Sequence, residues 1–126
     1  MNFITNNISR EDFGNVVNEY LYKKNITTSM LCKNAGIDRR LLSKFVGKQN
    51  YHPSKDTAMA ICIGLGLNSN EARDILSLSG YSFANNSRRD LAVLYALDSK
   101  KYCNITEVNK LILYLGERPF KNRFGN

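Results

Sequence analysis

Apolar residues recur at intervals of three and four along nearly the whole chain, and this spacing constrains the fold more than any other feature. It is the spacing of one face of an α-helix, whereas a half-buried strand alternates apolar and polar residues. The first run shows the pattern, with apolar residues at positions 13, 16, 17, 20 and 21. No segment alternates convincingly. The sequence therefore predicts an all-α fold.

Short polar side chains and glycines mark the ends of seven expected helices. Such side chains accept hydrogen bonds from free N–H groups in the first helical turn, and an acid three residues later adds the offset of a capping box. Glycine readily takes the left-handed conformation that ends many helices. The expected caps are Ser9, Asp38, Ser54, Asn68 (with Glu71), Ser87 (with Asp90) and Asn104 (with Glu107), and Gly36 ends a helix from Thr28 to Ala35.

The connections between these helices are short, and the chain of 126 residues has the size of one domain. Residues 51–53 are expected to form a loop, because the residue before Pro53 disfavours helix. The only plausible seam lies at Ser82 to Ser87, between five helices and a two-helix extension. Beyond Gly116 the tail is basic, and we expect it to pack loosely.

Several function classes are disfavoured by what the sequence lacks. The apolar stretch Ala58 to Leu67 is too short to span a bilayer, and the polar N-terminus has no signal-peptide core, so we expect a cytoplasmic protein. The cysteines (Cys32, Cys62 and Cys103) are odd in number and widely spaced, which favours structural thiols over a metal site. His52 is the only histidine, and no catalytic or phosphate-binding motif occurs. We expect no enzyme activity, cofactor or metal.

The net charge of +7 is concentrated in two blocks of the chain. Residues 21–60 carry eight basic and two acidic side chains, and residues 88–126 carry eight and four. The segments 1–20 and 61–87 are slightly acidic. A localised basic face suits a polyanionic partner such as nucleic acid, although a basic surface can also serve solubility alone.

The segment from Thr27 to Phe45 has the spacing of a helix-turn-helix. Two helices that cross steeply need a small residue at their contact, and Cys32 provides it. Gly36 follows four positions later at the turn, and Ile37 supplies the apolar residue that enters the core. Leu42 and Phe45 then anchor the second helix and leave its opposite face free.

With these residues the chain resembles the Cro/C1-type (lambda repressor-like) helix-turn-helix family. The resemblance covers about residues 13–80, including the lead Pro53 to Ala58 into the fourth helix. It is closest to a bacterial subgroup with the segments Ala35 to Arg40, Tyr51 to Lys55 and Gly80-Tyr81, followed by an extension similar to Arg88 to Leu115. The implied fold is a five-helix bundle in a DNA-binding domain, residues 1–82, plus two helices in a C-terminal extension, residues 83–126.

The same resemblance implies which residues meet DNA. The helix from Asp38 to Val46 is the recognition helix, which enters the major groove. Arginine there suits guanine, and residues after the helix suit phosphates. Two departures are that Thr28 stands where glutamine is common, and that Asp38 is better explained as a cap than as a base reader. The implied DNA-binding residues are Thr28, Arg39, Arg40, Ser43, Lys44, Lys48, Gln49 and Asn50.

The sequence therefore favours a transcriptional regulator that binds double-stranded DNA in a sequence-specific way, as a repressor and as a homodimer. Residues 87–115 offer two amphipathic helices that either form the dimer interface or enlarge one core. Sixteen asparagines indicate an AT-rich genome, typical of low-GC bacteria and their phages. The alternative is a helix-turn-helix protein of a mobile element that binds a protein or RNA partner, for example as an inhibitor of a host defence nuclease.

Overall fold

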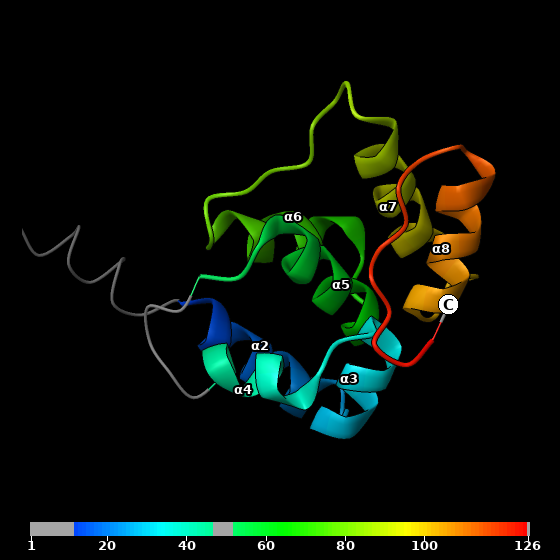
Figure 1. Cartoon of the computed structure of the whole chain (residues 1–126). Coiled ribbons are helices and arrows are strands. Elements are labelled where there is room, and N and C mark those ends of the chain that lie inside the picture. Colours follow the sequence, from blue (N-terminus) through cyan, green and yellow to red (C-terminus); the bar gives the residue numbers. More distant parts are fainter. Residues whose placement is uncertain (1–11, 47–51, 126) are drawn as a thin grey trace, which may run out of the picture.

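The computed structural model describes residues 12–46 and 52–125, and within these ranges it contains helices and no strand. The all-α prediction is confirmed. Figure 1 shows the helices in chain order. They are α2 (Phe13–Lys23), α3 (Thr28–Ala35), α4 (Arg39–Val46), α5 (Lys55–Leu65), α6 (Ser69–Ser77), α7 (Arg88–Ser99) and α8 (Ile105–Tyr114).

Most of the predicted helix caps are confirmed. Ser54 caps α5, and Asn68 with Glu71 forms a complete capping box at α6. Ser87 and Asn104 also accept hydrogen bonds from the N–H groups three residues later. The prediction for the first helix was wrong, since Asp12 caps α2 with an Oδ1 that accepts from the Asn15 N–H at 2.8 Å. Ser9 itself lies outside the described residues.

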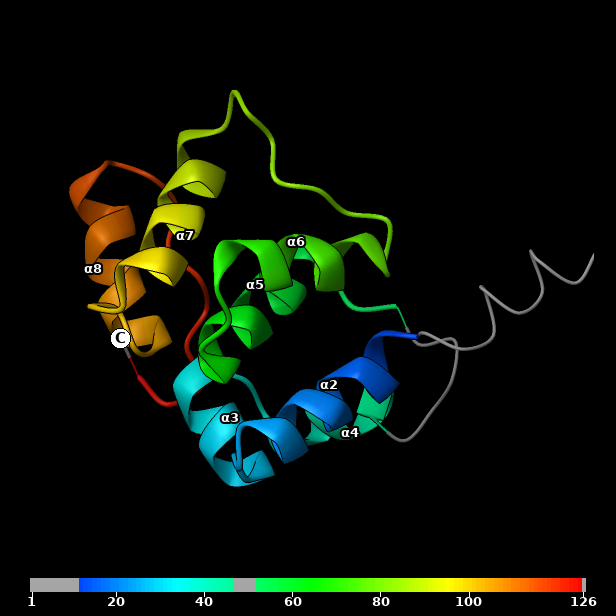
Figure 2. The ribbon, with the colours of Figure 1, turned by 180° about the vertical axis from the view of Figure 1, so that it is seen from behind.

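Helix α5 occupies the centre of the molecule. Every residue from Ala58 to Leu65 is buried, because α5 contacts α3 along much of its length and also contacts α6, α7 and α8. Figures 1 and 2, from opposite sides, both place α2 and α4 on one side of α5 and place α7 and α8 on the other. No helix in the described part of the chain is long and apolar enough to cross a bilayer.

Helices α3 and α5 approach so closely that the contact requires a glycine. A Cβ built on Gly64 of α5 lies 2.7 Å from Leu31 Cδ1 and 2.9 Å from Ala35 Cβ, both of α3. Its distance to the Ala35 backbone nitrogen is 3.1 Å, so moving the Leu31 side chain alone does not make room. Gly64 therefore sets how α3 crosses the central helix.

The two parts of the chain, before and after residue 82, contribute to one cluster of buried side chains. Val17, Leu31 and Ile61 belong to it together with Val93 of α7 and Ile112 of α8. Cys32 and Cys62 are buried in the same cluster, where burial raises the pKa of both thiols, whereas Cys103 is exposed. The extension helices thus enlarge one core, which is one of the two uses expected for them.

The tail beyond Gly116 differs from expectation, because it is packed against the rest of the molecule. In Figures 1 and 2 it runs back from α8 towards α3. We call residues 117–125 the C-terminal strap. Phe120 in the strap is only 4% exposed, so the prediction of a loose tail was wrong.

Candidate nucleic-acid interface

The turn between α3 and α4 has the geometry that its sequence predicted. Gly36 adopts the left-handed conformation with φ of 70°, which glycine takes without the penalty that a Cβ imposes. Its N–H and that of Ile37 both donate to the Cys32 carbonyl. Ile37 is buried, as expected for the apolar residue that follows the turn, and Leu42 is buried, as expected for an anchor of the second helix. The Phe45 side chain lies outside the described part.

Asp38 begins α4 as a cap, as the sequence predicted. Its Oδ1 accepts a hydrogen bond from the Arg40 N–H at 2.9 Å, and its carbonyl accepts from Leu42 N–H at 3.1 Å. The hydrogen bond from the Arg40 backbone, followed by one from the Arg123 side chain, lowers the pKa of the Asp38 carboxyl. Asp38 is therefore a charged cap whose charge is partly balanced by Arg123.

The outer face of α4 carries four predicted contact residues, and the structure brings them together. At 3.6 residues per turn, positions 39, 40, 43 and 44 fall within an arc of roughly 140°. Arg39, Arg40, Ser43 and Lys44 are all exposed, whereas Leu42 faces the core. Ser43 Oγ donates to the Arg40 carbonyl at 2.9 Å. A short helix thus presents two guanidinium groups, an ammonium group and a hydroxyl to solvent.

The cations of this face differ in their pairing from Lys55 of α5 and Arg89 of α7. Within the described residues, no ion pair engages Arg39, Arg40 or Lys44. By contrast, Lys55 pairs with Asp90 at 2.6 Å and the buried Arg89 pairs with Asp56 at 2.8 Å. Cations without an ion pair remain available to a partner, whereas the Lys55 and Arg89 side chains already bind carboxylates within the fold.

The remaining predicted contacts lie near the start of α3 and after α4. Thr28 is the first residue of α3 and is exposed. The capping hydroxyl belongs to Thr27, whose Oγ1 accepts from the Met30 N–H at 3.1 Å, so the Thr28 side chain is not used as the cap. Lys48, Gln49 and Asn50 lie outside the described residues.

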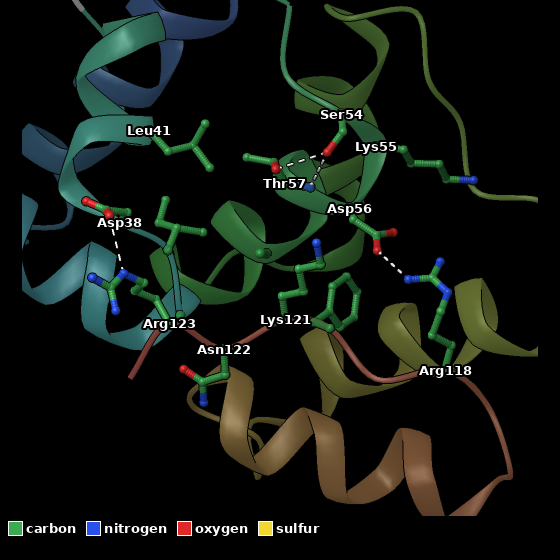
Figure 3. Close-up of a pocket in the computed structure, with 14 residues that line it drawn as sticks. Asp38, Leu41, Ser54, Lys55, Asp56, Thr57, Arg118, Lys121, Asn122 and Arg123 are labelled. Carbon is green, nitrogen blue, oxygen red and sulfur yellow. Dashed lines mark hydrogen bonds and ion pairs between the residues drawn. The ribbon is translucent and has the colours of Figure 1, made fainter. Parts of the chain in front are cut away.

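The C-terminal strap reaches the turn before α4, which the sequence reasoning missed. Arg123 donates its backbone N–H to the Gly36 carbonyl at 2.8 Å, and its Nε donates to Asp38 Oδ2 at 3.3 Å. Figure 3 shows this ion pair beside the start of α4. The basic tail contains two phenylalanines, of which Phe120 is buried and Phe124 is exposed, and these were the apolar signal of a packed segment.

A groove lies between the start of α4, the start of α5 and the strap, which form its walls. Its volume is about 920 Å³. Ile37, Leu41, Ala60 and Phe120 give it apolar surface. Lys121 extends between the walls in Figure 3, and Arg118 is held to Asp56 at the other end.

In the described part of the chain, no three His, Cys, Asp or Glu side chains gather as a metal site requires. His52 is exposed and meets the Tyr81 ring edge-on, at 6.2 Å between centroids.

None of the protein-family models, curated proteins or solved structures compared with the chain matches it.

Proposed function

We propose that the protein is a non-enzymatic transcriptional regulator of the lambda repressor-like type, which binds a specific sequence in duplex DNA. In this proposal α3 and α4 form the helix-turn-helix and α4 is the recognition helix. The observation that carries it is the exposed face of Arg39, Arg40, Ser43 and Lys44, whose cations have no ion pair among the described residues. The Gly36 turn and the Asp38 cap hold that face in place.

The residue types on α4 suit the edges of base pairs. An arginine fork donates two parallel hydrogen bonds to guanine O6 and N7 in the major groove, which distinguishes guanine from the other bases. Lys44 suits a phosphate or a guanine, and Ser43 suits several bases. Thr28, at the N-terminus of α3, suits a backbone phosphate, since helix N-termini favour anions.

Two copies of the chain pair on a palindromic site in this proposal. Symmetric half-sites in DNA match the two-fold symmetry of a protein dimer. Large apolar side chains are exposed on the outer faces of α7 and α8, where they are available to a second copy: Leu91, Tyr95, Leu113 and Tyr114. Light scattering of the purified protein, compared with Leu91→Glu, tests the pairing: we expect a dimeric mass that falls towards the monomer in the variant.

The function is tested by selection from a pool of random duplex DNA, followed by affinity measurements on the enriched sequence. We expect a palindromic motif and binding that persists at physiological salt. Arg39→Ala and Arg40→Ala should each weaken binding to that motif, by about 1–3 kcal/mol if each arginine reads a guanine.

The matched control is Lys101→Ala, which removes an exposed cation between α7 and α8. It should bind the motif as the wild type does. Weak binding that ignores sequence and disappears steeply with salt reflects only attraction to phosphates. That result would reject the proposal and favour the alternative, a protein or RNA partner.

A further inference from the structure

The C-terminal strap is anchored to α8 by a buried asparagine. Asn109 is 4% exposed, and its amide makes two hydrogen bonds with the Phe120 backbone. Its Nδ2 donates to the Phe120 carbonyl at 2.9 Å, and its Oδ1 accepts from the Phe120 N–H at 2.8 Å. Asn122 Nδ2 donates to Thr106 Oγ1 at 3.1 Å, again on α8. The backbone before Arg123 is therefore fixed at two points.

The other side of the strap is anchored to the turn before α4. The Arg123 N–H donates to the Gly36 carbonyl. A Cβ placed on Gly36 would lie 2.8 Å from Asn122 Oδ1, so the strap lies directly against the turn. Asp38 links α4 to the strap. One of its carboxylate oxygens accepts a hydrogen bond from the Arg40 N–H, and the other accepts one from Arg123 Nε.

This arrangement places the Arg123 guanidinium against Asp38, the residue directly before Arg39 at the start of α4. The Arg123 side chain is 65% exposed. Asp38 takes a single hydrogen bond from it, while a guanidinium carries five N–H donors. Lys121, two residues earlier, is exposed and has no ion pair within the described residues. The strap thus adds positive charge beside the proposed recognition helix.

We propose that the strap forms a second contact with duplex DNA, in which Arg123 and Lys121 bind backbone phosphates beside the N-terminus of α4. This inference rests on the proposed function and adds an element far along the chain to its interface. Cations on a loose tail lose conformational freedom when DNA orders them. The two anchors of the strap order its backbone in advance, so less of that entropy is lost on binding.

The test measures affinity against salt concentration for a fluorescein-labelled duplex carrying the selected motif and for a scrambled duplex of equal length. Each phosphate contact contributes about 0.9 to the slope of log K against log salt. We expect Arg123→Ala and Lys121→Ala each to reduce that slope by about 0.9 and to weaken binding to both duplexes by similar factors. Lys101→Ala, the matched control between α7 and α8, should change neither quantity. An unchanged slope in both strap variants overturns the inference.

A second set of variants separates phosphate contact from the pairing of Arg123 with Asp38. Removing Arg123 leaves the Asp38 charge unbalanced near the DNA, which by itself weakens binding. Asp38→Asn removes that charge and keeps a good capping residue. If Arg123 contacts phosphate, Asp38→Asn/Arg123→Ala binds more weakly than Asp38→Asn and has the shallower slope. Equal affinities and slopes in these two variants would show that Arg123 serves Asp38 alone, and would overturn its role in DNA contact.

The two proposals fail in distinguishable ways. Arg39→Ala and Arg40→Ala test α4, and each should weaken binding to the selected motif more than binding to the scrambled duplex. Loss of this sequence preference with no effect from the strap variants supports the recognition helix and rejects the strap contact. A salt-slope effect from the strap with no effect from α4 rejects the recognition helix instead.

Discussion

Asn109 is the single side chain on which the path of the strap most depends. It satisfies both backbone groups of Phe120 inside the protein. Asn109→Ala leaves these groups without their partners, and a buried unsatisfied polar group costs about 1–3 kcal/mol. We expect the free energy of unfolding to fall by roughly that amount in urea titrations. Hydrogen exchange at the Arg123 N–H, which bonds to Gly36, should accelerate as the strap loosens.

Lys110→Ala serves as the control for this change, because Lys110 is the adjacent residue of α8 and is exposed. Surface substitutions of this kind usually change stability by no more than about 0.5 kcal/mol. If Asn109→Ala behaved like this control, the strap would be held by something other than the amide of Asn109.

Gly64 offers a second prediction at a single residue. Alanine has the better helix propensity by about 1 kcal/mol, so a solvent-facing position would gain from the change. At Gly64 the added methyl group meets Ala35 of α3 at 2.9 Å, and overpacking costs typically about 1–3 kcal/mol. Gly64→Ala should therefore lower the thermal midpoint. Asn70→Ala, at an exposed position of α6, should leave the midpoint unchanged or raise it. A midpoint that rises in Gly64→Ala contradicts the close crossing of α3 and α5.

At the scale of elements, an ion-pair network joins α5, α7 and the strap. Arg89 of α7 donates from two nitrogens to the two oxygens of Asp56 in the first turn of α5, at 2.8 and 3.1 Å. Arg118 of the strap donates to the same carboxylate at 2.9 Å. Arg89 also donates to the Arg118 carbonyl and lies 4.1 Å from the Phe120 ring centroid. One carboxylate thus fixes three elements together.

This network makes a prediction about pH. Burial raises the pKa of Asp56, but the hydrogen bonds from Arg89 and Arg118 outweigh it, and the net shift is downward. A lowered pKa in the folded state stabilises the fold above the unfolded pKa of about 3.9, and this contribution is lost as pH falls through the folded value. Asp56→Asn should reduce stability at pH 7 by roughly 2 kcal/mol, less than the about 3–5 kcal/mol of a fully buried pair because Asp56 is partly exposed.

The measurement is urea unfolding of both proteins at pH 7 and at pH 3. The difference between wild type and Asp56→Asn should narrow at pH 3. The pKa values of Asp38 and Asp98 are also lowered, mainly by backbone hydrogen bonds from Arg40 and Ser69. Their contributions cancel in the comparison, since both proteins contain them. A difference that stays constant between the two pH values would exclude Asp56 as the titrating group.

The elements that could be predicted from the sequence are those whose determinants are local. A cap and its N–H partner are two or three residues apart, so Asp38, Ser54 and Asn68 were readable. The contacts of Asp90 and Glu107, the acids three residues after the caps of α7 and α8, were less predictable. Asp90 bonds to Ala84 N–H and to Lys55, and Glu107 accepts from the Cys103 N–H. The orientation of the Asp90 side chain depends partly on Lys55, which is 35 residues away. Local sequence spacing cannot predict such a distant contact.

The candidate site divides in the same way. The exposed face of α4 follows from periodicity, since Leu42 must be buried and residues 39, 40, 43 and 44 then face outward. The strap does not follow from any local pattern. Arg123 and Asp38 are 85 positions apart, and Asn109 meets Phe120 only because the chain reverses direction after the end of α8. A short basic tail with few apolar residues gives no periodicity from which that contact can be inferred.

The core that the extension, residues 83–126, shares with the rest of the chain bears on whether it folds as a separate unit. Buried side chains on both sides of residue 82 belong to one cluster. Ile105 of α8 lies against Gly36, with 2.8 Å between its Cγ2 and a Cβ placed there. Removing residues 83–126 would therefore uncover α3 and α5 to water. Each large apolar side chain so exposed forfeits about 1.5–3 kcal/mol, and a small domain has only about 5–15 kcal/mol of net stability.

We therefore expect the full chain to unfold in one cooperative transition and residues 1–82 alone not to fold stably. Urea unfolding should give the same midpoint by far-ultraviolet circular dichroism and by tyrosine fluorescence, since coincident transitions indicate two states. Both parts carry tyrosines, including Tyr20 in α2 and Tyr95 in α7. Two separated transitions, together with a sharp transition of the fragment 1–82, would establish independent domains. In that case the strap would be a contact between two folded units, and its anchors on the turn before α4 would open without unfolding either one.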